Sequence, residues 1–266
     1  MRHIWITLAY DGTHYAGFQR QENKMTVQEM VERAIFSLTG VQTTLYFVAR
    51  TDAGVHAFSQ ECTFYTDSSI PADRFYKALN TRLPPDIRVT QSCNRDMDFS
   101  VRRTNFGKTY GYLMTEERET TPFLYPYVWR VGHRLSTASM EEAARYLMGT
   151  HDFTSFRGNN SVPSSPIRTV RDIRIQREGS LVRLFVTGDG FLYHMVRNVA
   201  GTLAACGSGE LAPKEIPAIF AKQDRRALPA VTAPAKGLAL LSVYFSPIDK
   251  DAIDTALARP CLPWTK

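Results

Sequence analysis

The order of the predicted secondary-structure elements is the feature that most constrains this fold. Alternating apolar side chains predict strands, and a helix is predicted where Thr26 and Glu29 form a capping box and Gly40 ends the apolar pattern. The first half therefore has the order β-α-β-β-α-β. Its expected elements are strand 3–10, helix 26–40, strands 42–49 and 57–66, helix 72–83 and strand 86–93.

The second half repeats this order. Its expected elements are strands 105–116 and 127–132, helix 137–148, strands 167–177 and 181–187, helices 191–206 and 213–224, and strand 237–245. Two such halves predict an α+β protein made of two ferredoxin-like units. We expect the helices of each unit to cover one face of its sheet and to leave the other face free.

This order also predicts the domain organisation. We expect an N-terminal half over 1–104, a C-terminal half over 105–246 and a tail over 247–266, whose Ala-rich stretch has helical character. A free sheet face is typical of RNA-recognition domains, which stack bases on sheet aromatics. Paired units of this kind also build enzyme clefts, and the fold alone does not decide between the two.

Composition narrows the functional classes. The 266 residues carry 32 Lys and Arg against 26 Asp and Glu, and the net charge of +6 favours an anionic partner such as nucleic acid. No apolar run approaches the roughly 20 residues of a membrane span, and residues 1–10 do not resemble a signal peptide. Four scattered cysteines argue against a disulfide framework, so we expect a cytoplasmic protein.

The segment ARTDAGVHAFSQ (49–60) has the highest density of chemically useful residues. It falls on the loop between the two middle strands of the first half, where Arg50 and Asp52 flank Thr51. A carboxylate beside a guanidinium can serve as a nucleophile or a general base. The alternative is an ordinary turn in which Asp52 bonds its own backbone and Gly54 supplies a positive φ.

A second candidate segment is GDGFLYHMVRNVAG (188–201), which reads as a turn entering a helix. Phe191 and Met195 recur at helical spacing, and Arg197 lies on another face. A buried Arg is costly without a carboxylate, and Asp52 is a plausible partner. The alternative is that the apolar residues are core and Arg197 is solvated.

The linking segment FSVRRTNFGKTYGYLM (99–114) is basic and aromatic. Tyr110 and Tyr112 share a parity and so point to one face of a strand, where an aromatic ring can stack on a base or simply pack in the sheet. Further basic residues occur over 166–178 and 222–226, either as phosphate contacts or as a solvated face. The candidate substrate-binding residues are Tyr110, Arg102, Lys108, Phe191, Met195 and Arg168.

Other chemistries have little support in the sequence. It contains no phosphate-binding GxxxxGK[ST], no GxSxG, no HExxH and no metal-ligand spacing among its six His residues. YDGTHYAGF is not a dinucleotide-binding fingerprint, because Gly12 and Gly17 are too far apart. We therefore expect no nucleotide, metal or redox cofactor.

Six motifs in collinear order resemble one known family. They are YDGTHYAGFQRQ, ARTDAGVHA, SVRRTNFGKTYGY, HDFTSFR with PIRTV, GFLYHMVRNVAG and APAKGLALLSVYF, and together they span about residues 3–246. The chain resembles the TruA family of tRNA pseudouridine synthases. Its departures are Ala49 where the family usually has Gly, Asp189 where Asn or His is common, and Arg103 where many members carry an aromatic.

The resemblance implies an isomerase of tRNA processing that converts uridine to pseudouridine in the anticodon arm, typically at positions 38, 39 and 40. It implies that Asp52 is the catalytic carboxylate, Arg50 its motif arginine, Tyr110 the neighbour of the target base and Arg197 the partner of Asp52. It further implies a homodimer without a cofactor, in which two antiparallel sheets join around a central basic cleft.

The residues leave the route at the ribose open: Asp52 either attacks C1′ or removes a C2′ proton. They also leave other classes open. A non-catalytic RNA-binding protein explains the charge and the aromatics but does not require Asp52 beside Arg50. A metal-dependent nuclease or phosphatase needs more carboxylates than the two in candidate loops, Asp11 and Asp52. A structural assembly protein does not explain a charged motif on a loop.

Overall fold

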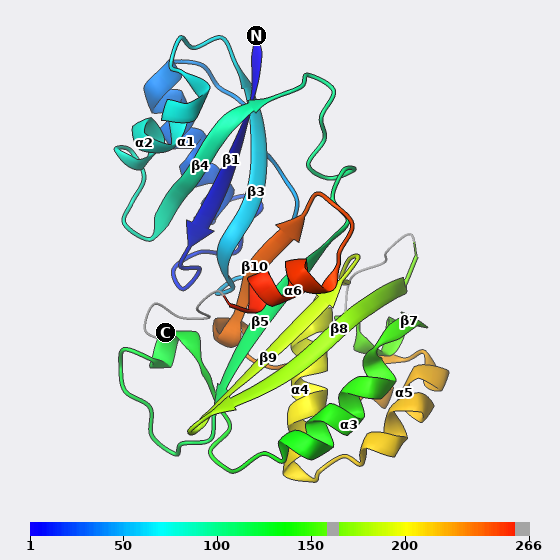
Figure 1. Ribbon diagram of the computed structural model, residues 1–266. Coiled ribbons are helices and arrows are strands. Elements are labelled where there is room, and N and C mark those ends of the chain that lie inside the picture. Colours follow the sequence, from blue (N-terminus) through cyan, green and yellow to red (C-terminus); the bar gives the residue numbers. More distant parts are fainter. Residues whose placement is uncertain (159–164, 259–266) are drawn as a thin grey trace. The chain divides into compact units, whose positions relative to one another are not determined.

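The structure is a computed structural model that describes residues 1–158 and 165–258. Contacts divide the chain into two compact units (Figure 1). Among the described residues, the first comprises 1–106 together with 240–247, and the second comprises 107–158, 165–239 and 248–258. Each unit combines helices with mostly antiparallel strands, which confirms the expected α+β class.

The first unit has the predicted element order. Its elements are β1 (Arg2–Tyr10), α1 (Val27–Thr39), β2 (Tyr46–Phe47), β3 (His56–Thr66), α2 (Phe75–Asn80) and β4 (Ile87–Arg95). The strand order is β4-β1-β3, with β2 also pairing with β3. Ile4 and Ile6 are fully buried opposite Phe64 and Cys62 of β3. The Phe64 ring meets Phe75 of α2 edge-on at 5.4 Å, so the helices cover this face of the sheet.

Residues 240–247 belong to the first unit, whereas the sequence predicts 240–246 in the C-terminal half and 247 in the tail. They include most of β10 (Leu238–Tyr244), which lies beside β3 in the sheet. The backbone N–H of Phe106 donates to the Tyr244 carbonyl at 2.8 Å. Strand pairing over a long sequence separation therefore decides the contacts of this segment, and chain order does not reveal it.

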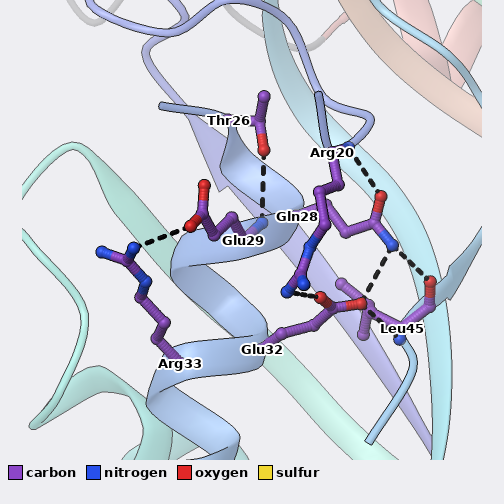
Figure 2. A network of polar contacts seen from close by, with 7 residues as sticks. All are labelled: Arg20, Thr26, Gln28, Glu29, Glu32, Arg33 and Leu45. Atoms are coloured by element: carbon purple, nitrogen blue, oxygen red, sulfur yellow. Dashed lines mark hydrogen bonds and ion pairs between the residues drawn. The ribbon is translucent and has the colours of Figure 1, made fainter. Parts of the chain in front are cut away.

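The strand expected over 42–49 is much shorter than predicted, and Figure 2 shows why. The Leu45 N–H donates to the Glu32 carboxylate at 2.9 Å, and the Gln28 amide donates to the Leu45 carbonyl at 3.3 Å. Both backbone groups of Leu45 are thus occupied by side chains of α1. A residue bonded in this way does not pair with a neighbouring strand, so β2 begins only at Tyr46.

The second unit contains most of the remaining elements. They are β5 (Gly107–Thr115), β6 (Trp129–Arg130), α3 (Thr137–Leu147), β7 (Gly149–Asp152), β8 (Ile167–Glu178), β9 (Leu181–Gly188), α4 (Met195–Ser208), α5 (Ile216–Lys222) and α6 (Lys250–Leu257). The strand order is β5-β9-β8-β7, and β6 pairs parallel to β5. The edge strand β7 was not predicted, and the expected strand 127–132 is reduced to the two residues of β6.

Helix α4 begins four residues later than predicted and ends two residues later. It starts at Met195 because His194 has a left-handed backbone with φ 61°, which a helix does not continue. Phe191 therefore lies on the preceding loop and not on the helix. Gly207 does not end the helix: a Cβ there would lie 2.9 Å from Met140 Cγ, so this glycine permits close packing against α3.

Both faces of the second sheet are covered, and the expectation of a free face is wrong here. Tyr110 and Tyr112 share one face, as predicted, and the Tyr112 hydroxyl donates to the Pro234 carbonyl on that face. Arg174 points to the opposite face and pairs with Asp254 of α6 at 2.6 Å. The C-terminal Ala-rich stretch forms this predicted helix (Figure 1), while 259–266 lie outside the described residues.

Candidate active site

Asp52 lies on the turn between β2 and β3 of the first unit. The turn is closed by the Val55 N–H, which donates to the Asp52 backbone carbonyl at 3.1 Å, and Gly54 has the predicted positive φ of 78°. Asp52 is half-buried, whereas Arg50 is exposed. The turn thus holds the backbone of Asp52 while Arg50 reaches solvent two residues away.

Two glycines of YDGTHYAGFQRQ (10–21), here called the opening motif, pack directly against this turn. A Cβ on Gly12 would lie 2.0 Å from the Val55 carbonyl oxygen, and one on Gly17 would lie 2.6 Å from the Thr51 carbonyl oxygen. Real Cβ atoms do not approach so closely, so only glycine fits at either position. This explains why the chain carries both glycines in DGTHYAGF, since the backbone at each glycine packs directly against the backbone of the Asp52 turn.

Side chains add to the support of the turn. The Tyr10 and Thr51 hydroxyls lie 2.7 Å apart, and the Gly12 N–H donates to His56 Nδ1 at 3.1 Å. The Gln60 amide exchanges two hydrogen bonds with the backbone of Ala49. These contacts were not foreseen, because residues 10–12 and 49–60 are brought together only by strand pairing.

A polar network anchors the end of the opening motif to α1 (Figure 2). The Arg20 N–H donates to the Gln28 side-chain oxygen at 2.9 Å, and the Arg20 guanidinium pairs with the buried Glu32 carboxylate. The Gln28 amide donates to the same carboxylate at 2.9 Å. Since the neighbouring Phe18 N–H donates to the Thr51 carbonyl at 3.1 Å, α1 is connected to the Asp52 turn through this motif.

In the second unit, aromatic candidates meet near the start of β5. The Tyr110 and Phe191 rings contact edge-on, with centroids 5.3 Å apart and planes at 86°. Gly188 permits the contact, since a Cβ there would lie 3.1 Å from the Phe191 ring. Tyr110 is 7% exposed, so its ring is fixed by packing and not free on an open sheet face. A fixed ring of this kind is suited to hold one face of a base.

Charged candidates lie at the same end of this sheet. Lys108 is paired in register with Gly188 and is half-buried. Burial lowers the pKa of Lys108 to about 8; the Asp189 carboxylate opposes this shift and the Arg168 guanidinium adds to it. Asp189 exchanges hydrogen bonds with Thr169, through its backbone N–H and its carboxylate. Two cations against one carboxylate leave a local positive charge.

The other candidates have different surroundings. Arg197 is half-buried on α4, and its Nε donates to the Ala233 carbonyl at 2.7 Å. Met195 is fully buried, so its side chain belongs to the core of the second unit. Arg102 lies over the Phe47 ring at 4.9 Å and donates to the Phe47 carbonyl, which fixes it beside the strand that leads to the Asp52 turn.

Within residues 1–158 and 165–258, no three His, Cys, Asp or Glu side chains are grouped so as to hold a metal ion. In the same ranges, no helix is long and apolar enough to cross a membrane.

Comparison with known proteins assigns the family. Residues 6–102 and 143–246 match the family model described as tRNA pseudouridine synthase. The tRNA pseudouridine synthase A of Acetivibrio thermocellus is 44% identical over 245 residues, which cover 92% of this chain and all of that protein. The enzyme of the same name from Clostridium acetobutylicum is 42% identical over the same coverage. The chain therefore belongs to the TruA family of tRNA pseudouridine synthases, which are isomerases.

Proposed function

We propose that this chain converts uridine to pseudouridine in the anticodon arm of tRNA, at positions such as 38, 39 and 40, with Asp52 acting at the ribose. The observation that carries the proposal is the turn of Asp52. It rests on close backbone contacts at Gly12 and Gly17, Arg50 lies two residues away, and the whole turn falls within residues 6–102, which match the family model. A turn held this firmly presents a carboxylate at little reorganisation cost.

The reaction is an isomerisation and needs no redox partner. The N1–C1′ bond breaks, the base turns, and a C5–C1′ bond forms; the proton lost from C5 is balanced by a proton gained at N1. A stacked uridine must first be flipped out of the arm, at a cost of a few kcal/mol. Asp52 then acts either as a nucleophile at C1′ or as a base toward C2′.

The remaining candidates receive roles from their surroundings. Tyr110, braced by Phe191, stacks on the flipped base. Lys108 and Arg168 bind backbone phosphates near it, and Arg102 adds a positive charge beside the Asp52 loop. Arg50 helps to extrude the base. We retain the sequence-based predictions that Arg197 pairs with Asp52, that two ferredoxin-like sheets flank a basic cleft, and that the enzyme works as a homodimer.

The decisive experiment measures tritium release from tRNA labelled at uridine C5. We expect the wild type to release tritium and Asp52→Asn to bind tRNA without releasing it. Asp86→Asn is the matched control: Asp86 is also half-buried, and it accepts a hydrogen bond from Tyr15 at 2.8 Å, which an amide oxygen also accepts. This control should keep full activity.

The outcomes separate the alternatives. Release by both the wild type and Asp52→Asn keeps the enzyme and refutes the role of Asp52. Binding without release by the wild type, with several tRNAs tried, supports a non-catalytic RNA-binding protein instead.

The stacking role of Tyr110 has its own test. Tyr110→Phe keeps the ring against Phe191, and Tyr110→Ala removes it. We expect the first variant to retain most of its kcat and the second to lose about 10-fold or more, since base–aromatic stacking contributes about 1–3 kcal/mol. Equal losses in both would assign the effect to the hydroxyl.

A further inference from the structure

A segment of the second unit, here called the crossing segment (228–234), runs closely over α4. A Cβ on Gly201 of α4 would lie 1.9 Å from the Val231 carbonyl oxygen. Four residues earlier on the helix, Arg197 and Ala233 exchange two hydrogen bonds. The Ala233 N–H donates to the Arg197 carbonyl at 3.2 Å, and Arg197 Nε donates to the Ala233 carbonyl at 2.7 Å.

The bond at Nε orients the arginine side chain. Once Nε–H points at a fixed carbonyl, the plane of the guanidinium is set, and its two terminal nitrogens face one direction as a rigid fork. The position of the Ala233 carbonyl therefore controls where Arg197 directs its charge. Whatever holds the crossing segment also holds Arg197.

One hydroxyl ties the crossing segment to α4. Thr232 Oγ1 donates to the Asn198 side-chain oxygen at 2.6 Å and accepts from Arg225 Nη2 at 3.1 Å. Asn198 is fully buried, and its amide nitrogen donates to the Phe156 carbonyl at 2.7 Å. With its nitrogen occupied in this way, Asn198 can only present its oxygen to Thr232.

The guanidinium of Arg225 completes this network, and no carboxylate of residues 1–158 or 165–258 pairs with it. It donates to Thr232, to Asn198 and to the Leu228 carbonyl, so both ends of the crossing segment are linked to it. Burial lowers the pKa of Arg225. A partly buried cation that bonds only neutral oxygens has a structural task, and here the task is to hold one short segment in register with α4.

We propose that Thr232, held by Asn198 and Arg225, is a positioning residue that sets the direction of the Arg197 guanidinium through Ala233. The inference rests on the proposed function, in which Arg197 is the partner of the catalytic carboxylate. It assigns three further residues to that function, although none of them contacts the substrate. Arg197 lies next to Asn198 in the chain, so helix and crossing segment are locked at the point where the charge is needed.

The test compares Thr232→Val, which removes the hydroxyl, with Thr232→Ser, which keeps it. Thr202→Val is the matched control: Thr202 is a fully buried residue of α4 whose hydroxyl donates to the Asn198 backbone carbonyl at 2.8 Å. Thr232→Val should lower kcat for tritium release by about 10- to 100-fold with KM nearly unchanged, as expected for a misplaced group. Thr232→Ser should restore kcat, and Thr202→Val should leave it near wild type.

A second measurement does not depend on activity. The NMR signal of the Arg197 Nε–H, identified by its loss in Arg197→Lys, reports whether the bond to Ala233 persists. We expect its exchange with solvent to accelerate about tenfold or more in Thr232→Val and to stay unchanged in Thr232→Ser and Thr202→Val.

The results distinguish failure of this inference from failure of the proposed function. Unchanged exchange in Thr232→Val overturns the inference, and so does faster exchange with an unchanged kcat. Equal loss of kcat in the Val and Ser variants also overturns it, because serine retains the hydroxyl. If the wild type releases no tritium, the proposed function fails, and the exchange data still decide whether Thr232 holds Arg197.

Discussion

The two units hold their proposed charged groups in different ways. In the first unit, the closest contacts of the Asp52 turn are between backbone atoms, with Gly12 and Gly17 packed against the carbonyls of Val55 and Thr51, and side-chain hydrogen bonds add to them. In the second, the crossing segment beside Arg197 is held mainly by the side chains of Asn198, Arg225 and Thr232, and by one close glycine contact at Gly201.

The two sites should therefore tolerate substitution differently. A contact between two backbones cannot be relaxed by trimming a side chain, so the Asp52 turn should respond to substitution in an all-or-none manner. A side-chain network can lose one bond at a time, each bond contributing about 0.5–1.5 kcal/mol. The geometry of Arg197 should therefore be adjustable in steps.

The largest effect is expected for Gly12→Ala. The new Cβ would meet three backbone atoms of Val55, at 2.0, 2.6 and 3.1 Å, and no side-chain rotation relieves such a clash. We expect the free energy of unfolding to fall by about 3 kcal/mol, the upper end for overpacking, and tritium release to be lost. Gly40→Ala serves as control: it strains a left-handed helix end, but a Cβ there meets nothing within 4 Å. Chemical denaturation measures the stability of both variants, and tritium release per folded molecule measures their activity.

A smaller effect is expected for Gly201→Ala in the second unit. Its Cβ would lie 1.9 Å from the Val231 carbonyl, but Val231 is exposed and can move outward. Alanine also favours the helix over glycine by about 0.5–1 kcal/mol, which offsets part of the clash. We expect a net loss of about 1 kcal/mol of stability and a lower kcat, because the displaced segment carries the Ala233 carbonyl. Full activity in Gly201→Ala would contradict the claim that the position of the crossing segment controls Arg197.

Much of the fold was predictable, for physical reasons visible in particular elements. The alternation in 3–10 and the Thr26 cap of α1 are local signals, and both were confirmed. The short β2 was not predictable, because Leu45 bonds to side chains of α1 that lie 13 and 17 residues earlier. Nor was the covered face of the second sheet, since it depends on a helix from the C-terminal tail.

In the candidate site, too, local features were predictable from the sequence and contacts between distant residues were not. The motif around Asp52 is contiguous, so its turn and Gly54 could be predicted from sequence alone. The network around Arg197 draws on Phe156, Asn198, Arg225 and Thr232, and no spacing rule connects them. Met195 was assigned to substrate contact, yet the same apolar periodicity places it in the core.

The pH dependence of tRNA binding should report on the second unit, because that unit carries a cation whose pKa is lowered. The pKa of Lys108 is lowered to about 8, so its charge is present at pH 7 and mostly lost at pH 8.5. If it binds a phosphate, tRNA affinity should fall by up to about fourfold over this interval at constant salt, and Lys108→Arg should abolish the dependence. Lys77→Arg, at an exposed position of α2, is the control.

Stability should respond to the same group with the opposite sign. The folded pKa of Lys108 lies below the ordinary value of 10.5, so the unfolded chain binds more protons between about pH 8 and 10.5. The contribution of Lys108 to the free energy of unfolding therefore rises with pH across this window.

A wild-type affinity for tRNA that stays flat from pH 7 to 8.5 would remove Lys108 from the proposed phosphate contacts.

The smallest effect is expected at α6, whose ion pair lies outside both sets of contacts compared above. Asp254 is 44% exposed and Arg174 34%, and Arg174 keeps a second partner in Asp172 at 3.0 Å. Pairs with this much exposure contribute about 0–1 kcal/mol, so Asp254→Asn should lower the free energy of unfolding by about 0.5 kcal/mol and leave kcat unchanged. Asp251→Asn, on the exposed side of the same helix, should change neither. A clear loss of kcat in Asp254→Asn would mean that the tail helix also positions the reacting groups, so the charge of the second unit would depend on the tail helix in addition to the crossing segment.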